Sequence, residues 1–355
     1  MRIALYVADL SRNAGGGEVT ALRAAMALKE LGHEVDLLSS FIDRDVVKFV
    51  CESAGACIPP KILDLGSGRA YDKEPRSPIK AYLLRMHIFG GLTTSILLSS
   101  IVDKLASRIG AISREYDLEF TMHAFGPLPG SHVLIGDLVY FHYPVLLPSG
   151  DPPIPTYIPR IFSSFINKFN IGAVYKALTK VLCNGVRIYK LVANSTWTKE
   201  GLVNLNMRLL GLLPKSCGYE LALLIMKASV IYPPIEYELY SSNFDPGAKE
   251  NTVLSVSRYS PEKNLQSIIY VAAKVPQTHF VIVGTTKSSP SIKVVAQLES
   301  LIDRLRVKNV TLERDVPKGR LVELYSQAKI YLHPLRSEPF GIAIAEGAAA
   351  GAVPV

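Results

Sequence analysis

Two glutamates near the C-terminus stand eight positions apart, with a Pro-Phe-Gly turn after the first. Glu338 precedes this turn, and Glu346 follows in a stretch of small and apolar residues. Because a proline disfavours helix at the residue before it, Glu338 is expected in a loop. Gly341 lets the backbone approach a ligand closely and opens the next helix, and Glu346 lies about one and a half turns inside it. One acid can therefore face a sugar near the helix tip, while the other lies beside a neutral, hydroxyl-bearing part of the same ligand.

An arginine and a lysine form a second group of candidate residues, in the segment VSRYSPEKN. Arg258 follows a predicted strand, and Lys263 lies five residues on, at the start of a predicted helix. Such a pair at the carboxyl end of a strand can clamp a diphosphate and neutralise the charge that grows on a nucleotide diphosphate leaving group. No Asp-x-Asp motif offers a metal site in the right context, so we expect a reaction that needs no metal ion or other cofactor.

The elements that must position these residues alternate between strand and helix. Near the N-terminus, a buried strand is predicted at residues 2–8, followed by a glycine-rich turn, a helix over 18–31 and a strand at 33–39. In the last third of the chain, strands are predicted at 252–257, 279–284, 310–313 and 329–333, with helices at 261–273, 291–305, 318–327 and 342–350. The fold class is therefore α/β, with two Rossmann-like, doubly wound domains facing a cleft.

The domain boundaries follow from composition. Residues 236–251 are polar, contain Pro-Gly and lack periodicity, so they are predicted to be a linker between a first domain at 1–235 and a second at 252–355. The chain stops at Val353, Pro354 and Val355 as a further strand begins, so the second domain is expected to be truncated.

Composition limits the class of protein and its partners. The chain has 355 residues, 48% of them hydrophobic, and a formal net charge of +8. That balance suggests an anionic partner, namely nucleic acid, a phosphorylated substrate or an acidic membrane face, or else a merely basic surface. The four cysteines form no C-x-x-C pair and have no histidine at metal-ligand spacing, and the N-terminus is not a signal peptide.

Two segments could contact a membrane. Residues 86–102 form a long run without Asp, Glu, Lys or Arg, but they fall short of the roughly 20 apolar residues that span a bilayer. Residues 152–199 hold no Asp or Glu and mix lysines and arginines with aromatic and aliphatic residues, which is typical of a membrane-surface segment. A core helix with its basic side chains in water is the alternative for the second segment.

Together, the glutamates in EPFG…E and the cations in R…EKN resemble the hallmark of the retaining glycosyltransferases of family 4, which have the GT-B fold. Four segments are similar to the branch that passes mannose from GDP-mannose, in α-1,2 linkage, to the lipid-linked precursor of N-glycans. They are YFHYPVLLPSG (140–150), NSTWTKE (194–200), VIYPPIE (230–236) and VLSVSRYSPEKN (253–264).

The resemblance implies a role for each charged candidate. Arg258 and Lys263 would bind the donor diphosphate. Glu338 would contact the donor sugar near the reacting centre, and Glu346 would bind the ribose hydroxyls. His142 would lie near the donor sugar, so the catalytic group implied by the resemblance is Glu338, His142, Arg258 and Lys263.

Backbone groups complete the donor site that the resemblance implies. Part of it is the turn at the start of the last helix, at Phe340, Gly341 and Ile342. The rest is the N-terminal loop that approaches donor phosphate and acceptor, matched by Gly15, Gly16 and Gly17. From the residues alone, His142 could instead be a core histidine, and the glycines only a tight turn without the G-x-G-x-x-G spacing of a nicotinamide site.

The function implied is transfer of a hexose, mannose by resemblance, from a nucleotide-diphosphate sugar to a polyprenyl-linked glycan. The partners would be that donor, that acceptor and an anionic membrane surface, with no nucleic acid, and the location would be cytoplasmic and peripheral on a membrane. Two alternatives stay open. One is a soluble family 4 enzyme that acts on a small molecule or polysaccharide, and the other is a non-catalytic, truncated remnant.

Overall fold

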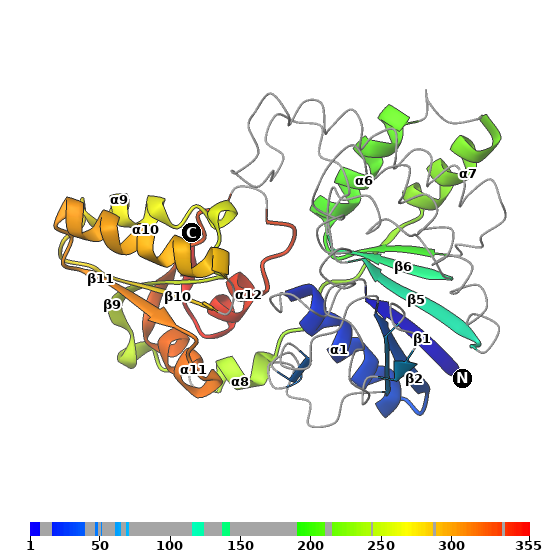
Figure 1. Ribbon diagram of the computed structural model, residues 1–355, viewed down its shortest axis with the longest axis horizontal. Coiled ribbons are helices and arrows are strands. Elements are labelled where there is room, and N and C mark those ends of the chain that lie inside the picture. Colours follow the sequence, from blue (N-terminus) through cyan, green and yellow to red (C-terminus); the bar gives the residue numbers. More distant parts are fainter. Residues whose placement is uncertain are drawn as a thin grey trace. The chain divides into compact units, whose positions relative to one another are not determined.

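The chain forms two compact units in a computed structural model. The structure describes residues 1–7, 16–39, 47–48, 51, 61–64, 69–70, 116–123, 137–142, 190–209, 215–242, 244–286, 289–335 and 338–355. Among these residues, the N-terminal unit ends at Tyr232 and the C-terminal unit begins at Pro233. Each unit has its own sheet and its own buried core (Figure 1).

The N-terminal unit is built on a sheet in which β1 is central. Its described strands are β1 (Arg2–Val7), β2 (Glu34–Ser39), β3 (Lys61–Asp64), β4 (Arg69–Ala70), β5 (Leu118–His123), β6 (Leu138–Phe141), β7 (Lys190–Ala193) and β8 (Ser229–Val230). Their order is β4-β3-β2-β1-β5-β6-β7-β8, parallel except for the β3–β4 pair. Because β2 and β5 lie on opposite sides of β1, the strand order reverses there, as in a Rossmann sheet.

Helix α1 (Gly16–Glu30) packs against this sheet. Leu5 and Val7 from β1 are fully buried, and they share a core with Leu22 and Ala25 of the helix. The run of apolar residues in β1 fits a strand that is buried on both faces. The predicted strand-helix-strand unit is therefore confirmed. The other described helices of this unit are α6 (Thr196–Leu209) and α7 (Lys215–Met226).

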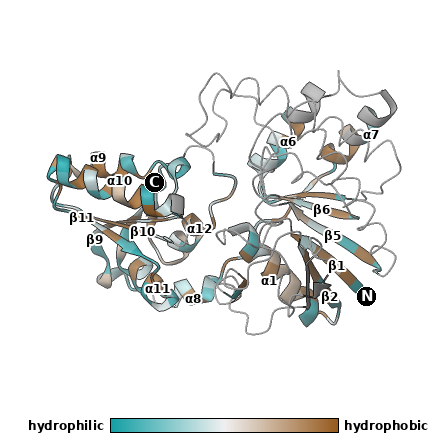
Figure 2. Cartoon of the chain, in the orientation of Figure 1, coloured by the Kyte–Doolittle hydropathy of each residue, from teal (hydrophilic) through white to brown (hydrophobic). Residues whose placement is uncertain are grey.

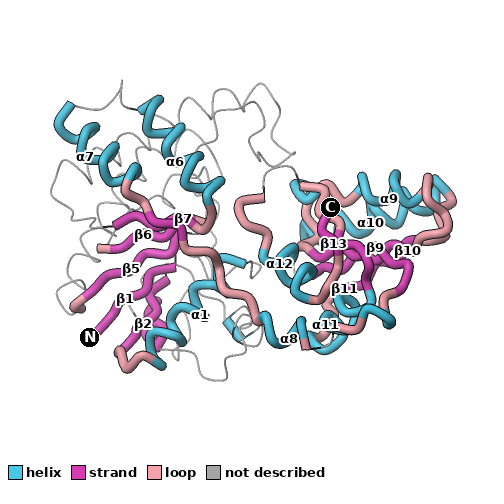
Figure 3. The backbone as a smooth tube through the Cα atoms, turned by 180° about the vertical axis from the view of Figure 1, so that it is seen from behind, coloured by secondary structure: helices cyan, strands magenta, loops and turns pink. Residues whose placement is uncertain are grey.

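The C-terminal unit has a fully parallel sheet among its described strands. These are β9 (Glu250–Val256), β10 (His279–Gly284), β11 (Val310–Arg314), β12 (Ala328–Tyr331) and β13 (Val353–Pro354). The order is β11-β10-β9-β12-β13, so β9 pairs with β10 on one side and with β12 on the other. This is the arrangement that the alternating pattern predicted, and Figure 3 shows these strands in magenta from behind.

Helices cover both faces of this sheet. They are α8 (Tyr237–Ser241), α9 (Gln266–Ala272), α10 (Ser289–Leu305), α11 (Lys318–Gln327) and α12 (Ile342–Ala349). On one face α9 and α10 contribute Ile268, Ile269 and Leu298 to a core with β9 and β10. On the other face α8, α11 and α12 pack around Tyr325 and Tyr331. In Figure 2, α9 and α10 carry both colours, as helices with one buried face do.

The structure departs from two local expectations in this unit. Within the predicted linker at 236–251, α8 forms and its Tyr240 is 1% exposed in the C-terminal core, because the aromatic ring there finds an apolar face to cover. The helix predicted over 261–273 is interrupted. A 3₁₀ turn at Pro261–Lys263 ends at Asn264, which adopts the left-handed conformation with φ 51°, before α9 begins. Asparagine tolerates this conformation better than most residues.

Candidate active site

The candidate site lies where the strand order of the C-terminal sheet reverses. Because β9 and β12 are parallel neighbours, the loops that follow them leave the same edge of the sheet side by side. Asn264 Nδ2, in the first loop, donates to Pro334 O in the second at 3.5 Å. Ligands in doubly wound sheets bind beyond the carboxyl ends of the strands at such a switch point. The first loop carries both predicted cations, and the second carries the first predicted acid.

Glu338 is held by two side chains on the same oxygen. Lys263 Nζ lies 2.7 Å from Glu338 Oε2, and His333 Nε2 lies 3.0 Å from that atom. Burial by itself raises the pKa of Glu338, but the hydrogen bond from His333 and the charge and hydrogen bond of Lys263 outweigh burial and lower this pKa to about 2. The carboxylate is therefore ionised at neutral pH and sits in a fixed orientation.

The segment after β9 is anchored by a buried tyrosine. Tyr259 is fully buried, and its hydroxyl contacts Ile282 O and Glu313 O at 2.8 Å each. Gly284, at the end of β10, lets this segment pass close by, because a Cβ there would lie 2.4 Å from Ser257 O. The cations on either side of Tyr259 are thus attached to a rigid part of the sheet edge.

Arg258 lies in the same loop but does not contact the first acid. Its Nη2 lies 3.6 Å from Glu262 Oε1, a spacing of four residues, and about a third of each side chain is exposed. The structure thus brings Lys263 together with Glu338 and leaves Arg258 at the carboxyl end of β9. The positions of Arg258 and Lys263 are compatible with the binding of one anionic ligand by both side chains. Their binding of the donor diphosphate stays a prediction.

Helix α12 begins directly after the turn that follows Glu338. Gly341 is its N-cap, with φ 80°, and Ala345 N donates to Gly341 O at 3.0 Å. The N–H groups of Ile342 and the following residues point toward the helix end, where the helix dipole favours negative charge. Phe340 and Gly341 lie at this tip, where the sequence placed backbone contacts to a ligand.

Glu346 lies further along α12 and contacts a different side chain from those that contact Glu338. Tyr325 Oη, from α11, lies 3.2 Å from Glu346 Oε2 and 3.1 Å from Ala343 O. Burial, with the nearby charge of Glu346 among the smaller causes, raises the pKa of Tyr325 well above its ordinary value, so the hydroxyl remains a donor. The two glutamates of the motif are therefore held by separate groups.

Gly341→Ala is expected to destabilise the fold by about 1–3 kcal/mol. The positive φ of 80° strains any L residue, and the added Cβ would lie 2.5 Å from Ile344 Cδ1 and 3.3 Å from Glu338 Cγ. Urea denaturation measures the loss. Gly319→Ala is the matched control, because nothing lies within 4 Å of its Cβ position in α11 and alanine favours helix. Equal stability of the two variants would contradict the strain at Gly341.

The remaining predicted site residues belong to the N-terminal unit. Gly16 and Gly17 open α1 after β1, and Thr20 Oγ1 donates to Gly16 O at 2.6 Å. His142 follows β6, its carbonyl accepts from Asn194 Nδ2 at 2.9 Å, and its ring meets Tyr140 edge-on at 4.9 Å. The two glycines and His142 lie at the carboxyl edge of their own sheet, and Gly15 falls outside the described residues.

The sequence predictions missed His333. It ends the predicted strand KIYLH, and no role was predicted for it. The signal available was its position, because a histidine at the carboxyl end of this strand precedes Glu338 by only five residues. The contact between their side chains depends on the loop geometry, which no spacing rule provides.

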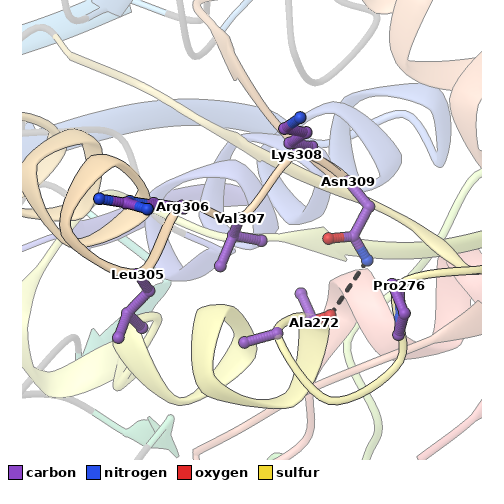
Figure 4. A pocket seen from close by; sticks show the side chains of 8 residues that line it. Ala272, Pro276, Leu305, Arg306, Val307, Lys308 and Asn309 are labelled. Atoms are coloured by element: carbon purple, nitrogen blue, oxygen red, sulfur yellow. Dashed lines mark hydrogen bonds between the residues drawn. The ribbon is translucent and has the colours of Figure 1, made fainter.

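A pocket of about 210 Å³ in the C-terminal unit lies at the opposite, amino end of its sheet. Figure 4 shows it between the end of α9 and the segment 305–309 that leads into β11. Asn309 Nδ2 faces the carbonyl groups of Ala272, Val275 and Thr278 at 3.1, 3.0 and 2.7 Å. This side chain joins the ends of the two segments, and the pocket lining contains none of the predicted site residues.

The described ranges contain no cluster of three or more His, Cys, Asp or Glu side chains that could hold a metal ion. Within the same ranges, no helix is both long and apolar enough to cross a membrane. The predicted membrane-contact segment at 86–102 lies outside the described residues, as does the one at 152–199 apart from 190–199.

Comparisons with known proteins agree with this geometry. Residues 238–355 match the family model for glycosyl transferases group 1. The chain is 26% identical to the GDP-Man:Man(3)GlcNAc(2)-PP-Dol alpha-1,2-mannosyltransferase of Dictyostelium discoideum, across 66% of this chain and 48% of that protein. For the Candida glabrata protein of the same name the identity is 24%, across 60% of this chain and 45% of that protein. The chain thus spans about half the length of these curated relatives.

Solved structures show the same fold. The crystal structure of Anabaena Alr3699/HepE in complex with UDP and glucose aligns with a TM-score of 0.62 at 16% identity, covering 100% of this chain and 80% of that one. WaaG, a glycosyltransferase involved in lipopolysaccharide biosynthesis, aligns with a TM-score of 0.56 at 14% identity, covering 99% of this chain and 80% of that one.

Two α/β units built on parallel sheets, with the alignments above, define the GT-B class of glycosyltransferase folds. The predicted α/β class with two Rossmann-like units is confirmed. The residues that match the family model for glycosyl transferases group 1 all lie in the C-terminal unit. The narrower assignment to family 4 and the truncation of the second domain stay predictions.

Proposed function

We propose that this chain is a retaining glycosyltransferase that moves mannose from GDP-mannose to a glycan carried on a polyprenyl diphosphate. The observation that carries the proposal is the pair Lys263 and His333 on Glu338, beside the N-terminus of α12. Cations and free N–H groups suit a diphosphate, and an ionised carboxylate suits the sugar attached to it. The names of the curated relatives support the choice of mannose, GDP and a lipid-linked acceptor.

The proposed mechanism is front-face transfer. The bond from the sugar C1 to the β-phosphate oxygen breaks, the acceptor hydroxyl oxygen bonds to C1 on the same face, and its proton passes to the leaving phosphate. Lys263, Arg258 and the start of α12 would stabilise the charge that grows on the diphosphate. Retaining hydrolases instead use two carboxylates about 5 Å apart. The side chains that contact Glu338 in the described chain are a lysine and a histidine, and this scheme requires no metal ion.

The test is transfer of labelled mannose from GDP-mannose to a polyprenyl-diphosphate-linked glycan, followed by extraction of the lipid. We expect label in the lipid fraction, and we expect GDP at about 100 times its Kd to stabilise the protein by about 2.7 kcal/mol. UDP and UDP-glucose are the matched controls. If neither GDP-mannose nor UDP-glucose supports transfer, and neither GDP nor UDP raises the melting temperature, the proposal is wrong and the non-catalytic alternative is favoured.

We also propose that the chain acts at an anionic membrane surface. The net charge of +8 and the acid-free stretch at 152–199 support it. Flotation with acidic liposomes at low salt should carry the protein upward, and neutral liposomes should not. Retention at high salt would indicate apolar insertion, and release would indicate charge alone. A protein that never floats but transfers mannose to a water-soluble acceptor would favour the soluble alternative.

A further inference from the structure

The side-chain contacts of Glu338 fall on one of its two oxygens. Lys263 Nζ and His333 Nε2 both meet Oε2, at 2.7 and 3.0 Å, and the described part of the chain makes no hydrogen bond to Oε1. An ionised carboxylate only accepts hydrogen bonds, and each oxygen has two lone-pair sites. Two donors saturate Oε2, so Oε1 is the oxygen that remains for a ligand hydroxyl.

The contact also determines which nitrogen of His333 carries a hydrogen. Nε2 faces an anionic oxygen at 3.0 Å, so it must be the N–H donor, because two facing lone pairs would repel. His333 Nδ1 is buried and has no hydrogen-bond partner among the described residues, and the side chain is 8% exposed. A second N–H there would be a buried donor without an acceptor, which is costly.

The ring of His333 is held by neighbouring tyrosines. It stacks on Tyr331 at 6.4 Å with planes 14° apart, and Tyr331 stacks on Tyr325 at 5.9 Å. Tyr331 Oη donates to Val256 O at 2.9 Å, which ties this column of rings to the end of β9. The imidazole is therefore fixed in orientation, with its N–H on Glu338.

We propose that His333 is a positioning residue, which holds Glu338 Oε2 jointly with Lys263 so that Oε1 receives a hydroxyl group of the donor hexose. This rests on the proposed function, in which Glu338 contacts the donor sugar. It goes further by giving a defined role to His333, which lies outside the glutamate and cation motifs. Because this role concerns the sugar and not the nucleotide, loss of His333 must affect binding of the hexose and leave binding of the nucleotide unchanged.

Asparagine and glutamine at position 333 form a matched pair. The amide nitrogen of glutamine can occupy the place of His333 Nε2, while that of asparagine stops near Nδ1 and cannot reach Glu338. His333→Asn should lower kcat about 10- to 100-fold, the worth of one hydrogen bond to a charged group. His333→Gln should restore most of the rate, and the Kd of GDP should be the same in both. His279→Asn is the control, because that histidine is exposed at the amino end of β10.

The outcomes separate this inference from the proposed function. An unchanged rate in His333→Asn, equal loss in both variants, or a parallel loss of GDP affinity and melting temperature would overturn the positioning role. A wild-type protein that transfers no mannose overturns the proposed mannosyl transfer alone. If the wild type transfers no mannose, the positioning role is tested by binding instead, as the affinity for GDP-mannose divided by that for GDP, or the affinity for UDP-glucose divided by that for UDP. Of the two variants, only His333→Asn should lower this ratio of affinities. A wild type that binds neither sugar nucleotide more tightly than its nucleotide overturns both the positioning role and the proposed function.

Discussion

Glu338→Gln is expected to lower kcat for mannosyl transfer by about 100-fold or more, with a smaller change in donor KM. The substitution keeps the shape of the side chain and removes its charge. In a transition state with positive charge on the sugar ring, an ionised carboxylate is worth most when the charge is fully developed. Steady-state kinetics on the lipid-linked acceptor measures the effect. Glu299→Gln is the control, because that acid pairs with Arg314 at an exposed position of α10. Equal rates in the two variants would contradict the role of Glu338.

The same substitution should change how stability depends on pH. In the folded state the pKa of Glu338 is lowered from 4.5 to about 2, so its contribution to stability is fully present above pH 4.5. That contribution disappears as the pH falls toward 2, because the folded state then binds the proton as well. At about 1.4 kcal/mol for each pKa unit, the contribution is on the order of 3 kcal/mol. Urea denaturation at neutral and at acidic pH should show a difference between wild type and Glu338→Gln that shrinks at the lower pH.

Lys263→Met should raise donor KM and lower kcat together, by about 10- to 1000-fold in kcat/KM. The lysine would meet the diphosphate, whose charge grows as the leaving group departs, and it also holds Glu338 at 2.7 Å. Removing it leaves a partly buried carboxylate with one partner fewer, so the fold should lose about 1–3 kcal/mol. Initial-rate kinetics and urea denaturation give the two quantities. Lys308→Met is the control, because that lysine is exposed at the amino end of the sheet, beside the pocket of Figure 4.

Two further variants separate the tasks of Lys263. The double variant Lys263→Met with Glu338→Gln should be less destabilised than the sum of the single changes, because the two side chains touch. Arg258→Met should raise KM and lower kcat without loss of stability, since that arginine pairs only loosely with Glu262 at 3.6 Å. Additive stability losses, or a loss in Arg258→Met as large as in Lys263→Met, would contradict the energetic importance of the contact between Lys263 and Glu338.

Much of the C-terminal unit could be predicted because its elements follow local rules. Residues 279–284 form a strand at the predicted positions, and the helix at 318–327 also has the predicted bounds. Gly341 opens the last helix as expected, since its left-handed backbone suits glycine. The local rules failed at Asn264 and at α8. There a turn conformation and the burial of Tyr240 outweighed the pattern in the sequence.

The candidate site was predictable only in part. Arg258 and Lys263 stand out in the sequence because they fall at the end of a predicted strand and the start of a predicted helix. Glu338 and Glu346 stand out because they flank a Pro-Phe-Gly turn that opens the next predicted helix. His333 did not stand out, since its importance comes from a single contact of 3.0 Å across a loop. Such a contact depends on side-chain geometry, which periodicity does not encode.

The alternation of strands and helices, the spacing of the two glutamates and the order of the two cations can be read directly from the amino-acid sequence. The contacts of Lys263 and His333 with one oxygen of Glu338 become visible in the folded chain, where Arg258 makes no such contact. The physical reason is that β9 and β12 pair side by side although they lie far apart in the chain. Their following loops therefore meet at one edge of the sheet, and the loop conformations then select which side chains touch.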